Sequence, residues 1–289
     1  MKKKLITATL LSVAALALVV ASVLGTIAIL SSSSAVSNVF TVGDVKINMF
    51  ESKVNPDGVK IDANGTPIQG TNASAKPVEV DTNSYHLVPG KTYVKDPTIR
   101  ITSDFESDQM YLFVKSRNQI REIEDANVNG DGESDTAHLS MRQQMENNGW
   151  VEFVQSGDGI EIVWVYGTRD ADGVITPTAV TKTSKQKLKD HQVERDGAVA
   201  GEFLLCSEFT IDENVDANIS RYASAKVNFT AFAVQTSGMS TGADDENIAK
   251  NAWTAIKNEY SFESGIINPV NPYDPNLKGD DAYDPVAKQ

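Results

Sequence analysis

The feature that most constrains the fold is a series of short runs of strand-forming residues, separated by turn residues. Asn38–Met49 alternates apolar and polar residues, and Lys226–Val234 is rich in β-branched and aromatic residues. Tight-turn pairs such as Asn64-Gly65 stand between such runs. Many short strands with regular turn signals are typical of a sandwich or a barrel. The pattern therefore predicts one all-β domain over roughly residues 38–262.

The run Lys226–Val234 is apolar on both faces of a strand. Alternation places Val227 and Phe229 on one face, and Phe232 and Val234 on the other. A strand that is apolar on both faces is buried on both. We therefore predict that this run is a central strand of its sheet.

Helical patterns are few, and they predict two or three peripheral helices. Asn247–Tyr260 carries apolar residues, Ala252 and Trp253 among them, on one stripe of a helix. A shorter helix is expected over Ala137–Asn148. The basic stretch Lys182–His191 is the candidate for a third.

Two segments are predicted to lack regular structure. Asn55–Asn83 is rich in Asn, Gly, Pro, Thr and Ser, with room for one hairpin. The C-terminal segment, residues 263–289, is acidic and contains four prolines. Proline at this density excludes helices and central strands, so a disordered tail is expected.

The chain opens with the pattern of a secretory signal peptide. Three lysines precede an uncharged apolar run, Leu5–Leu30. The run is long enough to span a bilayer, so a retained anchor is the alternative. Small residues follow it, however, and Thr26–Ala28 and Ser33–Ala35 both have the small-x-small form of a cleavage site. We predict cleavage after Ala28, which makes residues 1–28 the signal peptide of a protein secreted to the cell surface or the extracellular matrix.

The charge of the chain excludes several partners. The net charge is -13, and residues 1–28 contain three lysines and no acidic residue, so the mature chain carries -13 - 3 = -16. Such a surface repels phosphate backbones and anionic lipid headgroups. No nucleic-acid partner is expected, and membrane contact is expected only through the uncleaved signal peptide.

The single cysteine, Cys206, excludes an internal disulfide framework. It stands in the apolar run Phe203–Phe209, where a buried cysteine that packs as a small hydrophobe is expected. The alternative is a free thiol that joins two chains. A secreted chain without disulfides must rely on its core, and one large β domain provides enough apolar surface for this.

Catalytic patterns are absent from the sequence. The three histidines are His86, His138 and His191, and none belongs to an H-E-x-x-H zinc motif. His191–Glu194 matches half of the inverted motif, but Arg195 stands where a second histidine is required. There is no G-x-S-x-G elbow and no phosphate-binding glycine loop. We expect no enzymatic activity and no cofactor.

One acidic loop is a weak calcium candidate. Oxygen-bearing residues occupy the first, third and fifth positions of an EF-hand-like loop, with glycine at the sixth. The twelfth position is Thr136 instead of the bidentate glutamate. The alternative is a polar turn that leads into a helix. The candidate ligands are Asp125, Asn127, Asn129, Asp131 and Glu133.

Several stretches resemble, in order, one known family. Gly25–Ala28 is similar to its Gly-Thr-Trp-Ala junction, Phe40–Ile47 to its first mature strand, and Leu87–Asp96 to its Pro-Gly turn. Further similar stretches are Gly149-Trp150, Trp164–Gly167, Phe209–Asp212 and Val227–Val234. Together they resemble the TasA/camelysin family of Gram-positive exported proteins, whose signal peptides are cut by a dedicated signal peptidase. Ile27 departs from the family's tryptophan.

The resemblance implies a jelly-roll-like β-sandwich over residues 51–262 and a role as the main subunit of biofilm-matrix fibres. Family fibres grow by donor-strand complementation, in which one subunit's N-terminal segment completes the sheet of the next. Residues 29–50 are the candidate donor segment, with Gly43 as a hinge. The partner is then a second copy of the chain, with accessory matrix proteins as further partners. The side chains expected at the self-assembly interface are Phe40, Val42, Val45 and Ile47.

Three alternatives stay open. The N-terminal segment can instead be the first strand of the chain's own sheet. Camelysin relatives are classed as metallopeptidases, which suggests a surface peptidase. The same fold also suits an adhesin or coat-associated protein that does not polymerise, and fold alone does not separate it from a fibre subunit.

Overall fold

The computed structural model describes residues 39–42, 44–124, 138–156, 159–190, 193–197, 199–215, 219, 222, 224–236 and 252. Its larger sheet has six strands in the order β1-β14-β6-β8-β7, and β9 also pairs with β8. All pairs in this sheet are antiparallel except β1 with β14. The strands are β1 (Val39–Val42), β14 (Val227–Gln235), β6 (Met110–Asn118), β8 (Glu161–Arg169), β7 (Trp150–Gln155) and β9 (Ile175–Pro177).

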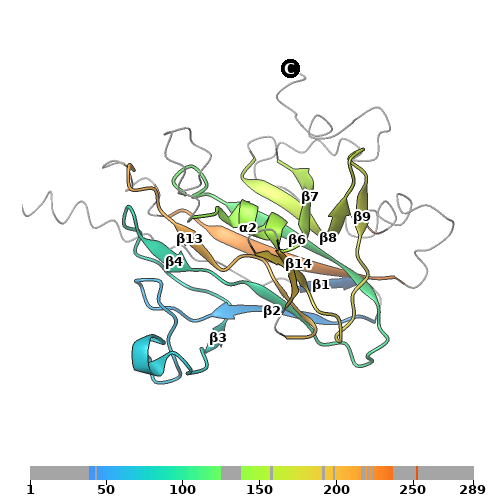
Figure 1. Cartoon of the computed structure of the whole chain (residues 1–289), viewed down its shortest axis with the longest axis horizontal. Coiled ribbons are helices and arrows are strands. Elements are labelled where there is room, and N and C mark those ends of the chain that lie inside the picture. Colours follow the sequence, from blue (N-terminus) through green and yellow to red (C-terminus); the bar gives the residue numbers. More distant parts are fainter. Residues whose placement is uncertain are drawn as a thin grey trace, which may run out of the picture.

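A second, antiparallel sheet has the order β12-β5-β2-β3. Its strands are β12 (Glu202–Leu204), β5 (Thr98–Ile101), β2 (Ile47–Ser52) and β3 (Glu79–Val80). Two antiparallel ribbons complete the pattern, β4 with β13 and β10 with β11. Their strands are β4 (Thr92–Val94), β13 (Glu208–Thr210), β10 (Lys187–Asp190) and β11 (Val193–Asp196). In Figure 1 the orange β14 lies above the blue β2 and the teal β4. The all-β prediction is confirmed.

The main core lies between the two sheets. Residues of β2 and β5, such as Met49 and Ile99, share one buried cluster with Phe229 of β14 and Trp164 of β8. Side chains at alternate positions of a strand point to opposite faces. Each sheet therefore contributes one face to this core.

The other face of the larger sheet is buried as well. Phe113, Val165 and Phe232 belong to a second apolar cluster, together with Ala252, which is helical and fully buried. Ala252 is the described residue of the helix predicted over Asn247–Tyr260. The prediction that Lys226–Val234 is a central strand is confirmed, because β14 has neighbours on both sides and is buried on both faces.

The short helix expected over Ala137–Asn148 is present as α2 (Met141–Asn147). It begins later than predicted because Ser140 is its N-cap and forms a capping box with Gln143. The third helix, predicted over Lys182–His191, is wrong: its second half is β10. Leu188 is buried while Lys187 and Lys189 are exposed, and this is the alternation of a strand.

The prediction that Asn55–Asn83 lacks regular structure is also wrong, although the one hairpin expected within it is present, with Ile61 bridged to Pro67 across Asn64-Gly65. The segment contains the short 3₁₀ helix η1 (Gly70–Asn72), β3 and two isolated bridges. The Asn83 side chain is buried, where its Oδ1 accepts from the Val54 amide at 2.9 Å and its Nδ2 donates to the Ser52 carbonyl at 2.8 Å. Hydrogen bonds to β2 and the residues after it order this polar segment.

Cys206 is free and buried, as expected for a cysteine that packs as a small hydrophobe. Burial raises the pKa of its thiol well above the ordinary value, which keeps it in the unreactive neutral form. The predicted signal peptide, residues 1–28, and the predicted tail, residues 263–289, lie outside the described residues. In the described part of the chain, no helix has the length and hydropathy needed to cross a bilayer.

Candidate functional site

The N-terminal edge of the larger sheet is the first candidate site. Four residues of β1 pair in parallel with Ala231–Val234 of β14, and Val39 is opposite Ala231. In the described residues, no strand pairs with positions 227–230 of β14 on this side. Among the described residues, therefore, only part of this edge of β14 is covered.

The connection from β1 to β2 crosses between the two sheets (Figure 1). Residue 43, the predicted hinge glycine, lies outside the described residues. After it, the Asp44 amide donates to Oε1 of Gln235 at 3.3 Å, and the Lys46 amide donates to Oγ of Ser103 at 2.8 Å. Lys46 also accepts from the Thr102 amide at 2.8 Å. The chain is thus fastened to the body of the domain from Asp44 onward.

Two of the four predicted interface residues precede the start of this connection, and the other two belong to the chain's own core. Phe40 and Val42 lie in β1, opposite Phe232 and Val234 of the same chain. Val45 and Ile47 are 1% and 7% exposed and belong to the chain's own main core. Phe40 and Val42 therefore precede the part of the chain that enters this core.

The predicted calcium loop cannot be placed. The candidate ligands lie outside the described residues, as does the predicted cleavage residue Ala28. Elsewhere in the described part of the chain, no group of three or more His, Cys, Asp or Glu side chains is arranged to hold a metal ion. The unplaced ligands are Asp125, Asn127, Asn129, Asp131 and Glu133.

The two described histidines have different surroundings. Nδ1 of His138 lies 3.2 Å from the hydroxyl oxygen of Thr210. His86 is half-buried, and its backbone amide donates to the Pro56 carbonyl at 2.9 Å. His191 lies outside the described residues. The pKa of the Asp57 carboxyl is lowered mainly by Lys91 and to a smaller extent by His86.

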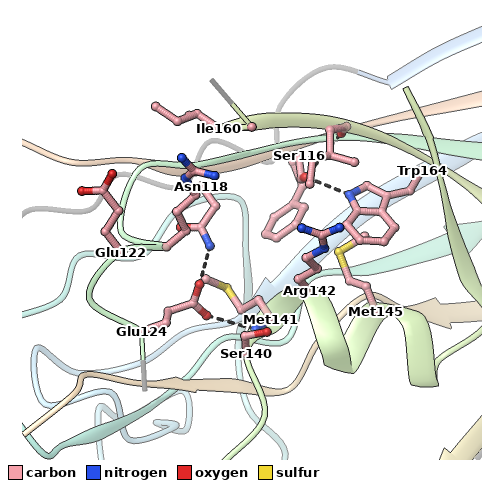
Figure 2. A pocket seen from close by; sticks show the side chains of 14 residues that line it. Ser116, Asn118, Glu122, Glu124, Ser140, Met141, Arg142, Met145, Ile160 and Trp164 are labelled. Atoms are coloured by element: carbon pink, nitrogen blue, oxygen red, sulfur yellow. Dashed lines mark hydrogen bonds between the residues drawn. The ribbon is translucent and has the colours of Figure 1, made fainter. Parts of the chain in front are cut away.

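A cavity of about 330 Å³ beside α2 is the second candidate site (Figure 2). Trp164 and Phe229 contribute apolar surface, as do Met141 and Met145. Nε1 of Trp164 donates to Oγ of Ser116 at 2.9 Å. None of the fourteen lining residues is a histidine or a cysteine. The cavity can bind an apolar group, and Glu122 and Glu124 contribute carboxyl groups to its lining.

Glu124 is the buried carboxylic acid of this cavity, and sequence analysis did not identify it. Its Oε2 accepts from Nδ2 of Asn118, and its Oε1 accepts from the Met141 amide at 3.0 Å (Figure 2). Burial raises the pKa of this carboxyl, while the two hydrogen bonds act in the opposite direction. Glu124 directly precedes the acidic loop in the sequence. The sequence pattern therefore did not distinguish its buried carboxyl from the carboxyl groups of that loop.

Comparison of the chain with protein-family models, with curated proteins and with solved structures gave no match.

Proposed function

We propose that the chain, once its signal peptide is removed, is the structural subunit of an extracellular matrix fibre that grows by donor-strand complementation. The single observation that carries this proposal is β1. It is a four-residue edge strand, it pairs in parallel with its own β14, and it precedes the connection that enters the core. A short parallel pairing is a weak one, because parallel pairs are slightly less stable per residue than antiparallel pairs.

A neighbouring subunit can offer β14 a better partner. Among the described residues, Val39–Val42 are the ones that pair with this edge. A segment from another subunit is not fastened to the same domain at Asp44, and residues 29–42 are longer than the nine-residue β14. Such a segment can pair with positions 227–230 as well. The additional backbone hydrogen bonds favour the exchanged, intermolecular pairing.

The remaining parts of the proposal come from the sequence and the topology. We propose that the two facing sheets form a jelly-roll-like sandwich, and that the leader directs the chain to the cell surface or matrix. Cleavage after Ala28 frees the donor segment from the membrane. The charge of the mature chain, -13 - 3 = -16, keeps the secreted subunit soluble until assembly begins.

A reversible covalent lock tests this mechanism. Thr41 and Ala233 are register partners in β1 and β14. Adjacent strands place partner residues within the separation that a disulfide spans, so Thr41→Cys with Ala233→Cys holds β1 in its own sheet. We expect the oxidised double variant to stay monomeric and the reduced one to form fibres, as seen by electron microscopy. Fibres formed by the oxidised variant would overturn donor-strand exchange of β1.

Deletion of residues 29–42 is the complementary experiment. On this proposal the truncated chain folds, because Val45 and the strands after it keep their core contacts, but it does not polymerise. A truncated chain that still forms fibres excludes the mechanism. A wild-type mature chain that stays monomeric at every salt concentration favours the adhesin alternative instead.

A further inference from the structure

Two oppositely charged side chains meet in the interior of the domain, and neither of them lines the candidate cavity. Glu51 belongs to β2, and Lys95 lies between β4 and β5. Nζ of Lys95 is 2.6 Å from Oε2 of Glu51, and both side chains have 0% exposure. Lysine and glutamate are almost never fully buried unless they are paired.

The pair lies among buried side chains, several of them aromatic. Nζ of Lys95 lies 5.7 Å from the centre of the Phe229 ring. Cys206 is also fully buried, and its thiol donates to the Lys95 carbonyl. The pKa of the nearby Tyr85 hydroxyl is raised well above its ordinary value, first by burial and then by the negative charge of Glu51. Water is thus largely excluded from this region.

An apolar site changes the chemistry of such a pair. In water, a carboxylate and an ammonium are each stabilised by hydration, and they do not condense. In a dry interior this stabilisation is lost, and the neutral acid and neutral amine become accessible. A desolvated neutral lysine is a competent nucleophile. Holding the two reacting groups in contact provides a large proximity advantage.

We propose that Lys95 and Glu51 form an intramolecular isopeptide bond in the folded protein. A proton first passes from the Lys95 ammonium to the Glu51 carboxylate. The neutral amine nitrogen then attacks Cδ of Glu51, the new N–C bond forms, and one C–O bond breaks. The departing oxygen leaves as water with two protons that came from the lysine. The reaction converts one ammonium and one carboxylate into one amide and one water, and it needs no oxidant or cofactor.

The bond would supply a covalent link that this chain otherwise lacks. Cys206 is the only cysteine, so no disulfide forms within the chain. Glu51 and Lys95 are 44 positions apart, and an amide between them ties β2 to the β4–β5 connection. Closing a loop of this length restricts the unfolded chain, as a disulfide does. The inference does not depend on fibre assembly.

The test is the intact mass of the purified mature chain under denaturing conditions. We expect a mass lower than the sequence mass by one water molecule, and proteolysis of the unfolded chain should release one branched peptide joined through Glu51 and Lys95. The unmodified sequence mass, with separate linear peptides containing each residue, would overturn the proposal. The same holds for a water loss located at an aspartate that precedes a glycine, where aspartyl dehydration is common; these are Asp57, Asp131, Asp158, Asp172 and Asp196.

The chain contains a matched control. Lys60 and Asp96 are also 2.6 Å apart, but their side chains are 36% and 14% exposed, so hydration is retained and no bond is expected there. The double variant Lys95→Met with Glu51→Leu fills the same space with apolar groups, a replacement that buried ion pairs often tolerate. It should have its full sequence mass and no branched peptide. A branched peptide through Lys60 would show that contact alone, without burial, is sufficient, and it would contradict the argument from desolvation.

Discussion

The backbone amide of Asp44 donates a 3.3 Å hydrogen bond to the side-chain oxygen of Gln235, the last residue of β14. The bond joins the residue after the predicted hinge to the strand that β1 covers. This hydrogen bond is exposed. It lies just beyond the Val42–Val234 pair, at the end of the β1–β14 pairing that is nearest the connection to β2. This hydrogen bond is therefore the contact nearest to β1 that restrains β1 from leaving the sheet for exchange.

Removing this restraint should accelerate assembly. A hydrogen bond contributes about 0.5–1 kcal/mol net, so Gln235→Ala should raise the population with β1 released, and the rate of fibre growth, about two- to fivefold. The rate is measured by light scattering on freshly cleaved protein. Gln119→Ala is the matched control, because Oε1 of Gln119 accepts from the Lys226 amide at 2.8 Å at the opposite end of β14. Equal acceleration by both variants would contradict a role for the connection.

The order of the Asn55–Asn83 segment can be tested with two glycines. Both have positive φ, +75° at Gly58 and +79° at Gly65. A Cβ on Gly58 would lie 2.6–2.8 Å from atoms of Tyr93, whereas one on Gly65 would meet nothing within 4 Å. We expect Gly58→Ala to lower the free energy of unfolding by about 2–4 kcal/mol, and Gly65→Ala by about 1 kcal/mol. The measurement is urea denaturation of both variants. If both lose a similarly small free energy of unfolding, the segment is not packed on Tyr93.

Sequence patterns predicted the elements whose apolar spacing is long and regular. The nine residues of β14 are apolar on both faces, and this was enough to place the strand inside a sheet. Lys182–His191 was misread because the strand in it spans only Lys187–Asp190, too short a run for its alternation to outweigh the basic composition. Asn55–Asn83 was misread because its order comes from hydrogen bonds of Asn83 instead of an apolar pattern.

The candidate sites were harder to predict, because they depend on contacts between distant residues. The pairing of Val39 with Ala231 joins opposite ends of the domain, and nothing in either run specifies a parallel register. Charged residues such as Glu51 and Lys95 are normally assigned to the surface, and only the packing of β2 against the β4–β5 connection buries them. The burial of Glu124 was missed for the same reason.

Glu124 gives a prediction on pH. Burial raises the pKa of its carboxyl above the ordinary value of 4.5, so the folded chain holds this proton more tightly than the unfolded chain does. The stability that this contributes is full below pH 4.5 and is lost as the pH rises through the folded pKa. In this window the difference in unfolding free energy between Glu124→Gln and wild type should change by up to about 1.4 kcal/mol per pH unit.

The amide in Glu124→Gln remains neutral, so the variant lacks this slope whatever constant offset its altered hydrogen bonds introduce. The measurement is urea denaturation at several values between about pH 4 and pH 8. Glu106→Gln, at an exposed carboxylate, should follow the wild-type profile. Profiles of Glu124→Gln and wild type that stay parallel would show that the folded chain does not hold this proton.

We expect no peptidase activity from the purified chain. The sequence lacks the zinc motifs that supply two histidine ligands and a general base at fixed spacing. Incubation with casein, with and without a zinc chelator, measures this. Chelator-sensitive cleavage that disappears in His191→Ala would contradict the prediction and favour the metallopeptidase alternative.

Salt should accelerate fibre growth. Without residues 1–28 the chain would carry -13 - 3 = -16, so on the proposed function two subunits repel each other before β14 and a donor segment can meet. At about 0.1 M salt the Debye length is about 10 Å, and repulsion between exposed charges beyond that distance is largely screened. The rate of fibre growth should therefore rise steeply up to roughly 0.15 M NaCl, and divalent cations should act at lower concentrations because they screen more strongly.

The disulfide-locked variant separates two effects of salt. If screening only brings subunits together, Thr41→Cys with Ala233→Cys in its oxidised form should remain monomeric at every salt concentration, because β1 stays on Ala231–Val234 and the acceptor edge is occupied. Reduction at the same ionic strength should restore fibre growth at the wild-type rate. If the oxidised variant instead forms particles as fast as the wild type when salt is added, then charge merely suppresses unspecific aggregation, and the edge of β14 is not the site at which subunits join.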